Sequence, residues 1–323
     1  MGVVIAAAGA IGAGAALPAA ASAACTKASN IEAILDDSGS MAVTDPDTLR
    51  VKATKLLINT FSSGTFLGAV EFGGSFDAST PAADTVFKPE AVGPNATAMG
   101  NALDAKILAD NGTTDYNAAF AQSDADNPNA GARIFLTDGA HNEGDYANGH
   151  LTHKVPTEVI SFGSGLTPDD QARLQTIAND TGGHYYPQVD SSQLQSVMNS
   201  IGAALTCLTP PQTFTDQLAQ GKAKSHSLAI GANTKSLQIA LTWSSPLDSF
   251  TISGLKLVNH GKTIAVAARG KLKVKRTTSA TFVLLKVSAL RRGTLRFKVK
   301  ATKVGSGQPQ ATLTTQVSHA RRK

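Results

Sequence analysis

The sequence has 323 residues, a formal net charge of +5 and only two cysteines. This length exceeds one ordinary domain core and predicts two domains. The composition also excludes a small scaffold held together by several disulfides, because each predicted domain is large enough to fold without them.

The first 24 residues contain no charged side chain and consist mostly of Ala and Gly. Pro18 precedes the small-residue run AAASAA, a pattern typical of an exported signal segment with a cut after Ala23. An uncleaved membrane anchor is the alternative, and the weak hydrophobicity of Ala and Gly favours cleavage over it. We therefore expect a secreted or extracytoplasmic protein, either released or held at the cell surface.

Residues 25–207 alternate between short apolar strand patterns and helical patterns. The expected strands are 31–36, 66–72, 84–92, 132–139, 157–163 and 184–189. The expected helices are 45–61, 96–110, 114–123, 168–180 and 191–205. The first helix places an apolar stripe at Leu49, Ala53, Leu56, Leu57 and Phe61. This alternation predicts an α/β fold, a doubly wound and mainly parallel sheet with helices on both faces.

The composition changes at the Pro-containing segment LTPPQT, residues 208–213. Residues 1–207 carry 9 Lys and Arg against 22 Asp and Glu, a net charge of −13, whereas residues 208–323 carry 20 against 2, a net charge of +18. The second part consists of short, β-branched, alternating segments separated by Gly, Asn and Ser, which predicts an all-β sandwich or jelly roll with Trp243 in its core. We thus expect domains at 25–207 and 208–323.

Cys25 and Cys207 bracket the α/β half. In an exported protein two cysteines meet oxidising conditions, so a disulfide is the default expectation and two free thiols are the alternative. We predict a bond that joins the two ends of the α/β domain.

Small oxygen-bearing side chains gather where two predicted strands end. The stretch ILDDSGSM, residues 34–41, ends its apolar run at Asp36 and continues through Ser38 and Ser40, and the strand at 132–139 ends at Asp138. Ligands of an open α/β sheet bind beyond the carboxyl ends of its strands, where the strand order reverses. We expect these loops to meet there, together with the loop that contains Thr113 and Thr114.

Two carboxylates and three hydroxyls form a set of hard oxygen donors, which suits Mg²⁺, Mn²⁺ or Ca²⁺ and does not suit zinc or copper. Mg²⁺ is the ion that we favour. The neutral hydroxyls leave the ion with residual positive charge, so a carboxylate from a ligand can complete its coordination. The pattern predicts a site that binds an acidic group.

These residues resemble the metal-ion-dependent adhesion site (MIDAS) of the von Willebrand factor type A (vWA) domain, which has a D-x-S-x-S loop, a separate Thr and a separate Asp. DDSGS matches the first motif, GTTDYNAAF the second and FLTDG the third, in the family's order over about residues 30–205. The resemblance assigns the metal to five residues, which are Asp36, Ser38, Ser40, Thr114 and Asp138. Thr113 leaves an ambiguity of one residue. Asp37 has no coordinating role in this motif, so Asp37→Ala is expected to matter far less than Asp138→Ala.

Other interpretations of the same residues are helix caps at the Asp and Ser residues of DDSGS and at the Thr before DYNAAF, and a turn at LTDG. A serine hydrolase, or a non-catalytic subunit of one, is the alternative function. The nucleophile-elbow motif G-x-S-x-G is absent, and His141, His150, His153 and His184 follow no recognisable triad order, so we interpret them as surface histidines and assign no enzymatic role. The signal segment disfavours assistance to a cytoplasmic motor ATPase.

The basic half resembles β-sandwich accessory domains of secreted bacterial proteins. Its Lys and Arg, as in KLKVKR and LRRGTLRFKVK, are expected either to attract an anionic surface or to form a solvated β face. Nucleic acid is not the expected partner, because aromatic residues do not alternate with these basic ones. The sequence as a whole predicts an exported binding protein whose partner is a protein or polymer that presents a carboxylate.

Overall fold

The computed structural model describes residues 26–74, 81–108, 112–259, 262–265, 273–288 and 290–321. The predicted signal segment, 1–24, and Cys25 lie outside these residues. Within the described residues, no helix has the length and apolar character needed to cross a membrane. The α/β half runs from Asn30 to Leu205, and the C-terminal β region runs from Gln212 to Arg321.

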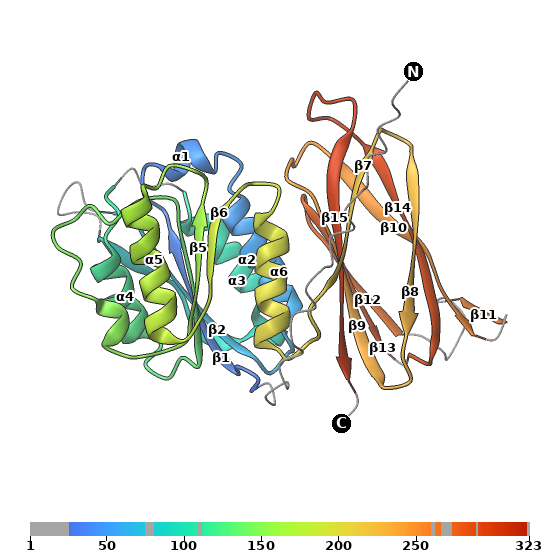
Figure 1. The fold of residues 1–323 in the computed structure, drawn as a ribbon, viewed down its shortest axis with the longest axis horizontal. Helices are drawn as coiled ribbons and strands as arrows, with labels where there is room; N and C mark the ends of the chain where they lie inside the picture. Colours follow the sequence, from blue (N-terminus) through green and yellow to red (C-terminus); the bar gives the residue numbers. More distant parts are fainter. Residues whose placement is uncertain are drawn as a thin grey trace, which may run out of the picture.

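A six-stranded sheet forms the centre of the α/β half (Figure 1). Its strands are β1 (Asn30–Asp36), β2 (Phe66–Phe72), β3 (Ala83–Ala91), β4 (Ala132–Thr137), β5 (Thr157–Phe162) and β6 (Tyr185–Val189). They lie in the order β3-β2-β1-β4-β5-β6, and all neighbours are parallel except the edge strand β3. Pro89 is tolerated in β3 because an edge strand has one side without ladder hydrogen bonds. The order reverses at β1, so β1 and β4 lie side by side at the switch point.

Helices cover both faces of this sheet (Figure 1). They are α1 (Met41–Thr44), α2 (Leu49–Thr60), α3 (Val92–Lys106), α4 (Tyr116–Asp126), α5 (Pro168–Thr181) and α6 (Leu194–Leu205). Buried side chains of α2, α3 and α6 share one core with the sheet, and those of α4 and α5 share the core on the opposite face. The doubly wound α/β prediction is confirmed, and the short helix α1 is an addition to it.

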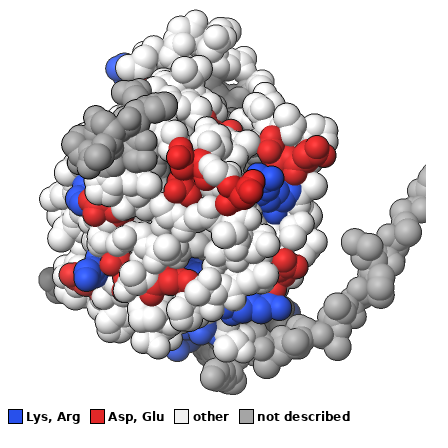
Figure 2. All heavy atoms as spheres, turned by 90° about the vertical axis from the view of Figure 1, so that its left-hand side faces the viewer, with Lys and Arg blue, Asp and Glu red and all other residues white. Residues whose placement is uncertain are grey.

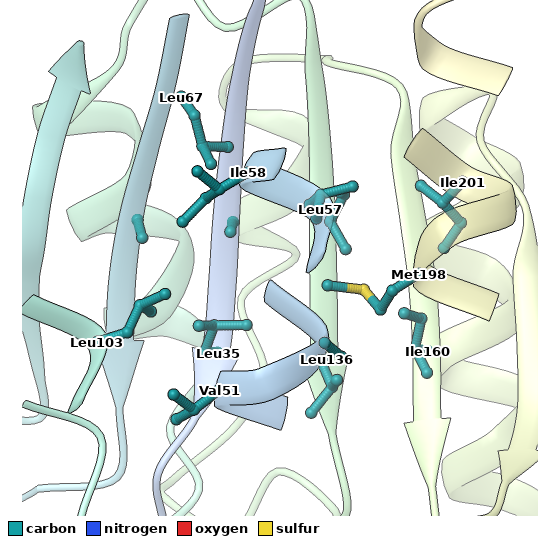
Figure 3. Close-up of a cluster of buried hydrophobic side chains, with 14 of the residues drawn as sticks. Leu35, Val51, Leu57, Ile58, Leu67, Leu103, Leu136, Ile160, Met198 and Ile201 are labelled. Carbon is teal, nitrogen blue, oxygen red and sulfur yellow. The ribbon is translucent and has the colours of Figure 1, made fainter. Parts of the chain in front are cut away.

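The core on the α2 face is built from alternate positions of the central strands. Leu35 of β1 and Leu136 of β4 point toward this face, where Leu57 of α2 and Met198 of α6 pack over them (Figure 3). Successive residues of a strand point to opposite faces, so Ile34, the residue before Leu35, belongs to the core on the other face. The strands are buried on both faces, which explains why they read as continuous apolar runs.

The β region contains two antiparallel sheets around one core. Its strands are β7 (Gln212–Leu218), β8 (Ala223–Ile230), β9 (Thr234–Thr242), β10 (Ser249–Asn259), β11 (Lys262–Ala265), β12 (Lys273–Thr278), β13 (Phe282–Ser288), β14 (Gly293–Lys303) and β15 (Ala311–Arg321). One sheet has the order β11-β10-β14-β8 and the other β12-β13-β9-β15-β7. Both contribute to the shared core, which includes Trp243 as predicted. The all-β prediction is confirmed.

The two halves pack against each other through α2 and α6 on one side and the five-stranded sheet on the other (Figure 1). Leu56 forms a small buried cluster with Ala240, Phe282 and Leu284. The helical stripe predicted for α2 is therefore wrong at Leu56, because this side chain faces the β region while Leu57 faces the sheet of its own half. Burial on two sides removes the polar face that an exposed helix would show.

Six hydrogen bonds link the same surfaces, two of them through serines of α6: Ser196 Oγ lies 3.5 Å from Thr242 Oγ1, and Gln316 donates to Ser200 Oγ at 3.0 Å. Gln195 donates to Trp243 O at 3.0 Å, and Asn199 donates to Gln316 Oε1 at 2.8 Å. From the β region, Gln238 donates to Thr60 O at 2.9 Å and the Lys286 ammonium donates to Phe61 O at 2.7 Å. Since these contacts mainly use neutral amides, the opposite net charges of the two halves are not needed to explain the packing.

Acidic side chains are distributed over the outer side of the α/β half. Figure 2 shows the side remote from the β region, where Asp and Glu lie among uncharged residues and basic side chains are less widespread. The predicted Cys25–Cys207 bond stays a prediction, because Cys25 lies outside the described residues. The chain close to Cys25 does lie at the end of α6, since Ala28 N donates to Leu205 O at 2.9 Å.

Candidate metal site

The sheet topology brings two acidic loops to one edge of the α/β half. β1 and β4 are parallel neighbours, with Leu35 beside Leu136, so the chain leaves both strands at the same edge. Asp36 is the last residue of β1, and Asp138 follows the last residue of β4. Both carboxylates are buried, with exposed fractions of 0% and 6%. Carboxylates this poorly solvated need a compensating partner.

The carboxylate of Asp36 accepts hydrogen bonds from the loop after β1 and from the end of β4. Its Oδ1 accepts the backbone N–H of Ser38 at 2.8 Å, which closes the turn after β1. Its Oδ2 accepts the hydroxyl of Thr137, the last residue of β4, at 2.6 Å. These two bonds fix the orientation of the carboxylate and tie the β1 loop to the end of β4.

Ser38, Ser40 and Asp138 form a continuous chain of oxygen atoms. The two serine hydroxyls lie 3.1 Å apart, and Ser40 Oγ donates to Asp138 Oδ1 at 2.7 Å. The second oxygen, Asp138 Oδ2, is buried and has no hydrogen-bond partner among the described residues. A buried carboxylate oxygen without a donor is costly in a folded protein unless an ion neutralises it.

The third loop contributes Thr114 rather than Thr113. A Cβ built on Gly139 would lie 2.9 Å from Thr114 Oγ1 and 3.7 Å from Ser40 Oγ, so both hydroxyls border the backbone just after Asp138. Thr113 lies on the other side, with its N–H and hydroxyl directed at Gly74 O. Of the two threonines, Thr114 is therefore the one whose oxygen joins the predicted set.

The electrostatics of the site favour an added cation. Burial, and then the charge of Asp138, raise the pKa of Asp36 to about 6, although hydrogen bonds from Ser38 and Thr137 act in the opposite direction. Two carboxylates that face each other in a poorly solvated space cannot both be ionised at low cost. A divalent cation between them would remove this repulsion and favour the ionised form of both.

Asp37 has a structural role that the sequence motif did not reveal. Asp37 Oδ1 lies 2.5 Å from Arg50 Nη2, Asp45 Oδ2 lies 3.0 Å from Arg50 Nη1, and all three side chains are fully buried. Asp37 Oδ2 also accepts the N–H of Leu108 at 2.8 Å. The loop residue between the predicted ligands is thus anchored to α2, and its substitution is not a neutral control as expected. Arg50 is the one charged side chain among the buried residues of α2.

Asp45 fixes the start of the same helix. Its carboxylate accepts the N–H groups of Leu49 at 2.6 Å and Arg50 at 3.0 Å, which satisfies two free donors of the first turn of α2. Gly73 completes the support from the β2 side, because a Cβ there would lie 2.2 Å from Ser38 N. The backbone of the metal loop is therefore enclosed by α2 and by the end of β2.

The interpretation of all four histidines as surface residues is wrong for two of them. His141 and His150 are buried, with 9% and 1% exposure, whereas His153 and His184 are exposed. His141 Nδ1 accepts the N–H of Tyr116 at 3.1 Å, so it links the loop after β4 to the start of α4. His150 Nδ1 lies 2.7 Å from the Tyr146 hydroxyl. Their burial could not be predicted, because the polar segments that contain His141 and His150 pack against α4 only in the folded protein.

The residues present fit a hard divalent cation. Two carboxylates and three hydroxyls border one space, and the unpaired Asp138 Oδ2 supplies an oxygen without another function. Within the described part of the chain, no three His, Cys, Asp or Glu side chains gather as they would at a zinc site. The chemistry of the donor set thus agrees with Mg²⁺, Mn²⁺ or Ca²⁺.

The whole chain is similar to several solved structures. One is a von Willebrand factor type A protein from Catenulispora acidiphila, at 16% identity and a TM-score of 0.46 over 91% of this chain and 63% of that one. The pilus adhesin SpaC from Lactobacillus rhamnosus GG is similar at 12% identity and a TM-score of 0.46, over 92% and 44%. Manganese-loaded TRAP protein from Plasmodium vivax is similar at 17% identity and a TM-score of 0.41, over 63% and 87%. The chain thus spans less than two thirds of the first two structures.

No curated protein matches the sequence. Residues 30–200 match the family model of the von Willebrand factor type A domain, and this range is more than half of the chain. The match covers the strands of the α/β sheet, its helices up to most of α6, and all three loops of the candidate site. The family resemblance predicted from the motifs is confirmed, and the chain belongs to the von Willebrand factor type A domain family.

Proposed function

We propose that this protein is an exported, non-enzymatic binding protein that captures an acidic group through one divalent cation. Asp36, Ser38, Ser40, Thr114 and Asp138 would hold the ion, which we take to be Mg²⁺, with Mn²⁺ and Ca²⁺ as the other candidates. The bound ion would supply a positive coordination centre for a carboxylate of a protein or polymer ligand. The chain's own residues would fix the ion's position and leave its outer side open to the ligand.

The observation that carries this proposal is the unpaired, buried Asp138 Oδ2 beside a row of hydroxyls. In a site completed by the protein alone, this oxygen would accept a hydrogen bond. The hydroxyl ligands are neutral, so the two carboxylates balance the charge of a divalent ion without exceeding it. A coordination position left open on the ion would then be filled by a carboxylate oxygen of the ligand.

A hydrolytic role for the serines is not favoured by their contacts. Ser40 Oγ donates to a carboxylate, Asp138, and Ser38 Oγ lies against Ser40 Oγ. His141 uses its Nδ1 to accept the N–H of Tyr116 rather than to contact a serine. A serine nucleophile needs a base within hydrogen-bond reach. We therefore propose a binding role rather than catalysis for this site.

Calorimetric titration of Mg²⁺, Mn²⁺ and Ca²⁺ into the wild-type protein and Asp138→Ala tests the metal site. We expect the wild type to bind one ion and Asp138→Ala to bind it at least about 100-fold more weakly, because the variant loses a charged ligand. Asp47→Ala is the matched control, since Asp47 is an exposed aspartate that follows α1. Equal binding by the wild type and Asp138→Ala would refute the site.

Ligand capture requires a separate measurement. Immobilised poly-glutamate should retain the metal-loaded wild type and release it when EDTA is added, whereas a neutral polymer should not retain it. Retention that is unchanged by EDTA would show that the basic β region, and not the ion, holds the acidic polymer.

Export is the second part of the proposal and rests on the composition of residues 1–24 and on the two cysteines. N-terminal sequencing of the protein recovered outside the producing cells should show a start just after Ala23. A thiol assay without reductant should find no free thiol, as a Cys25–Cys207 bond requires. A full-length protein that stays inside the cell with two free thiols would contradict export.

A further inference from the structure

A cavity of about 360 Å³ in the β region is lined by three lysines. It lies on β9, β12 and β13, on the sheet that packs against α2. The polar side chains at its wall are Lys273, Lys275, Lys286, Ser236, Gln238 and Ser288. Among the described residues, no Asp or Glu lines this cavity. All of these polar groups are able to donate a hydrogen bond.

The strand register places like charges opposite each other in this cavity. Lys275 of β12 pairs with Lys286 of β13, which in turn pairs with Gln238 of β9. Lys273 pairs with Ser288, one step further along the same face. Side chains of directly paired residues lie close together, and like charges in this arrangement destabilise a sheet. The repulsion calls for a compensating negative charge.

Partial burial of one member, Lys286, makes this pair different from a fully exposed one. Lys286 is partly buried beside α2, and its ammonium donates to Phe61 O at the end of that helix. Burial, and then the charge of Lys275, lower the pKa of Lys286 to about 8. The Lys256–Arg296 pair of the other sheet has the same register but is exposed, so water screens it.

Among the described residues of the two halves, no Asp or Glu lines this cavity or contributes to the pKa shift of Lys286. Residues 208–323 contain two acidic residues, Asp216 and Asp248. Asp216 lies 2.7 Å from His226 Nε2, and Asp248 accepts the N–H groups of Gly305 and Ser306. From the α/β half, Lys27 donates to Ser62, the residue after Phe61, and thus adds positive charge on this side. Within the described part of the chain, the three ammonium groups thus have no acidic partner in the cavity, and a bound anion would supply the compensating charge.

We propose that the cavity lined by Lys273, Lys275 and Lys286 is a binding site for a tetrahedral oxyanion of the phosphate class. Such a group has several acceptor oxygens and up to two negative charges, which match three ammonium groups and two serine hydroxyls. The site does not depend on the metal site, because it lies at the C-terminal end of α2 whereas the metal loop adjoins the N-terminal end of that helix. A phosphate ester of a larger molecule is recognised by the same donors.

Inorganic phosphate is the probe for the first test. In calorimetric titrations at physiological ionic strength, we expect the wild type to bind phosphate and Lys275→Gln to bind it about tenfold more weakly or worse, because a charged hydrogen bond is lost. Lys298→Gln, an exposed lysine of β14 in the other sheet, is the control and should bind as the wild type does. Acetate should bind more weakly than phosphate.

A second measurement distinguishes a ligand site from a purely structural one. Without phosphate, Lys275→Gln should be as stable to urea as the wild type or more stable, because a repulsive pair is removed. With phosphate, the wild type should gain more stability than the variant. The Lys286 pKa, followed by the NMR shift of its ε-carbon, should rise on phosphate addition, since a nearby anion favours the charged ammonium.

Three results would overturn the proposal. They are absence of phosphate binding to the wild type, equal binding by the wild type and Lys275→Gln, and equal loss of binding in Lys298→Gln. The last outcome would show that phosphate responds only to overall charge. Lys275 is exposed and makes no described hydrogen bond that its loss would break, so a failure of this variant to fold is not expected.

Discussion

Charged side chains anchor the loop after β1, which contains the predicted metal ligands, to α2. Arg50 lies fully buried between Asp37 and Asp45, and this arrangement joins the loop after β1 to the first turn of α2. The motif alone assigned Asp37 no role, since the identity of its partner depends on how the chain folds back on itself. Removing one partner of a buried ion pair leaves an uncompensated buried charge. This destabilises the fold more than replacing both partners with apolar residues does.

We predict that Asp37→Ala lowers the free energy of unfolding by about 3 kcal/mol, because it leaves Arg50 with one carboxylate fewer and Leu108 N without an acceptor. Urea denaturation of the wild type and the variant measures this change. Asp47→Ala, at an exposed position, should stay within about 0.5 kcal/mol of the wild type. A similarly small effect of Asp37→Ala would argue against the anchoring role.

Glu32 is a second buried charge, on β1 but remote from the ligands. Its side chain is fully buried, accepts a hydrogen bond from Asn127 at 2.9 Å, and has its pKa raised from 4.5 to about 8, mainly by burial. The unfolded chain releases this proton at lower pH than the folded one does. The stability of the protein therefore falls as pH rises from about 4.5 to 8.

Glu32→Gln should remove this pH dependence, because the amide cannot ionise. At pH 8 we expect the variant to be more stable than the wild type by on the order of 3 kcal/mol, and at pH 4.5 to be close to it. Urea denaturation at both pH values provides the measurement, with the exposed Glu143→Gln as control. A variant that is less stable at pH 8 would show that Glu32 is stabilised as a carboxylate.

At the scale of elements, the sequence predicted strands and helices where their burial is uniform. β1, β4 and β5 are buried along almost their whole length, so their apolar runs were clear. β7 was missed because its side chains are mostly exposed and polar, as at an edge of a sheet. α1 was missed because four residues are too few for a helical period. Strand ends also position the site, since they set the distance between its loops.

Gly139 tests how closely these loops must approach. A Cβ at this position would come within 2.9 Å of Thr114 Oγ1, so Gly139→Ala should displace that hydroxyl while the strands stay in place. We predict metal binding about tenfold weaker, with stability reduced by about 1 kcal/mol or less. Calorimetric titration and urea denaturation separate the two effects. Gly165→Ala is the control, because its Cβ would meet nothing within 4 Å. If both variants bind the metal with equal affinity, Thr114 is not one of the ligands.

At the scale of the whole molecule, the packing of the two halves could not be predicted from the sequence. Leu56 and Leu57 are adjacent in the chain and equally apolar, yet they face different halves. The choice depends on the outer surface of β9, β13 and β15, which no local pattern describes. The composition boundary near Cys207 separates the two net charges but says nothing about this contact.

The interface should make the two halves unfold together. Leu284→Asp would bury a carboxylate against Leu56, and we expect it to lower the free energy of unfolding by about 3 kcal/mol or more. Differential scanning calorimetry should show one transition for the wild type and two for this variant. Leu151→Asp, at an exposed position, is the control and should keep the single transition. Two transitions in the wild type would contradict cooperative unfolding of the two halves.

The six hydrogen bonds and the apolar cluster between the halves have a mechanical consequence. They are spread over the C-terminal part of α2 and the N-terminal part of α6 rather than gathered at one point. If a ligand pulls on the metal edge while the β region is held, the load is shared among these contacts as shear instead of opening them one after another. In a single-molecule pulling experiment, the joint between the halves should therefore yield at a higher force than the same contacts peeled apart in sequence.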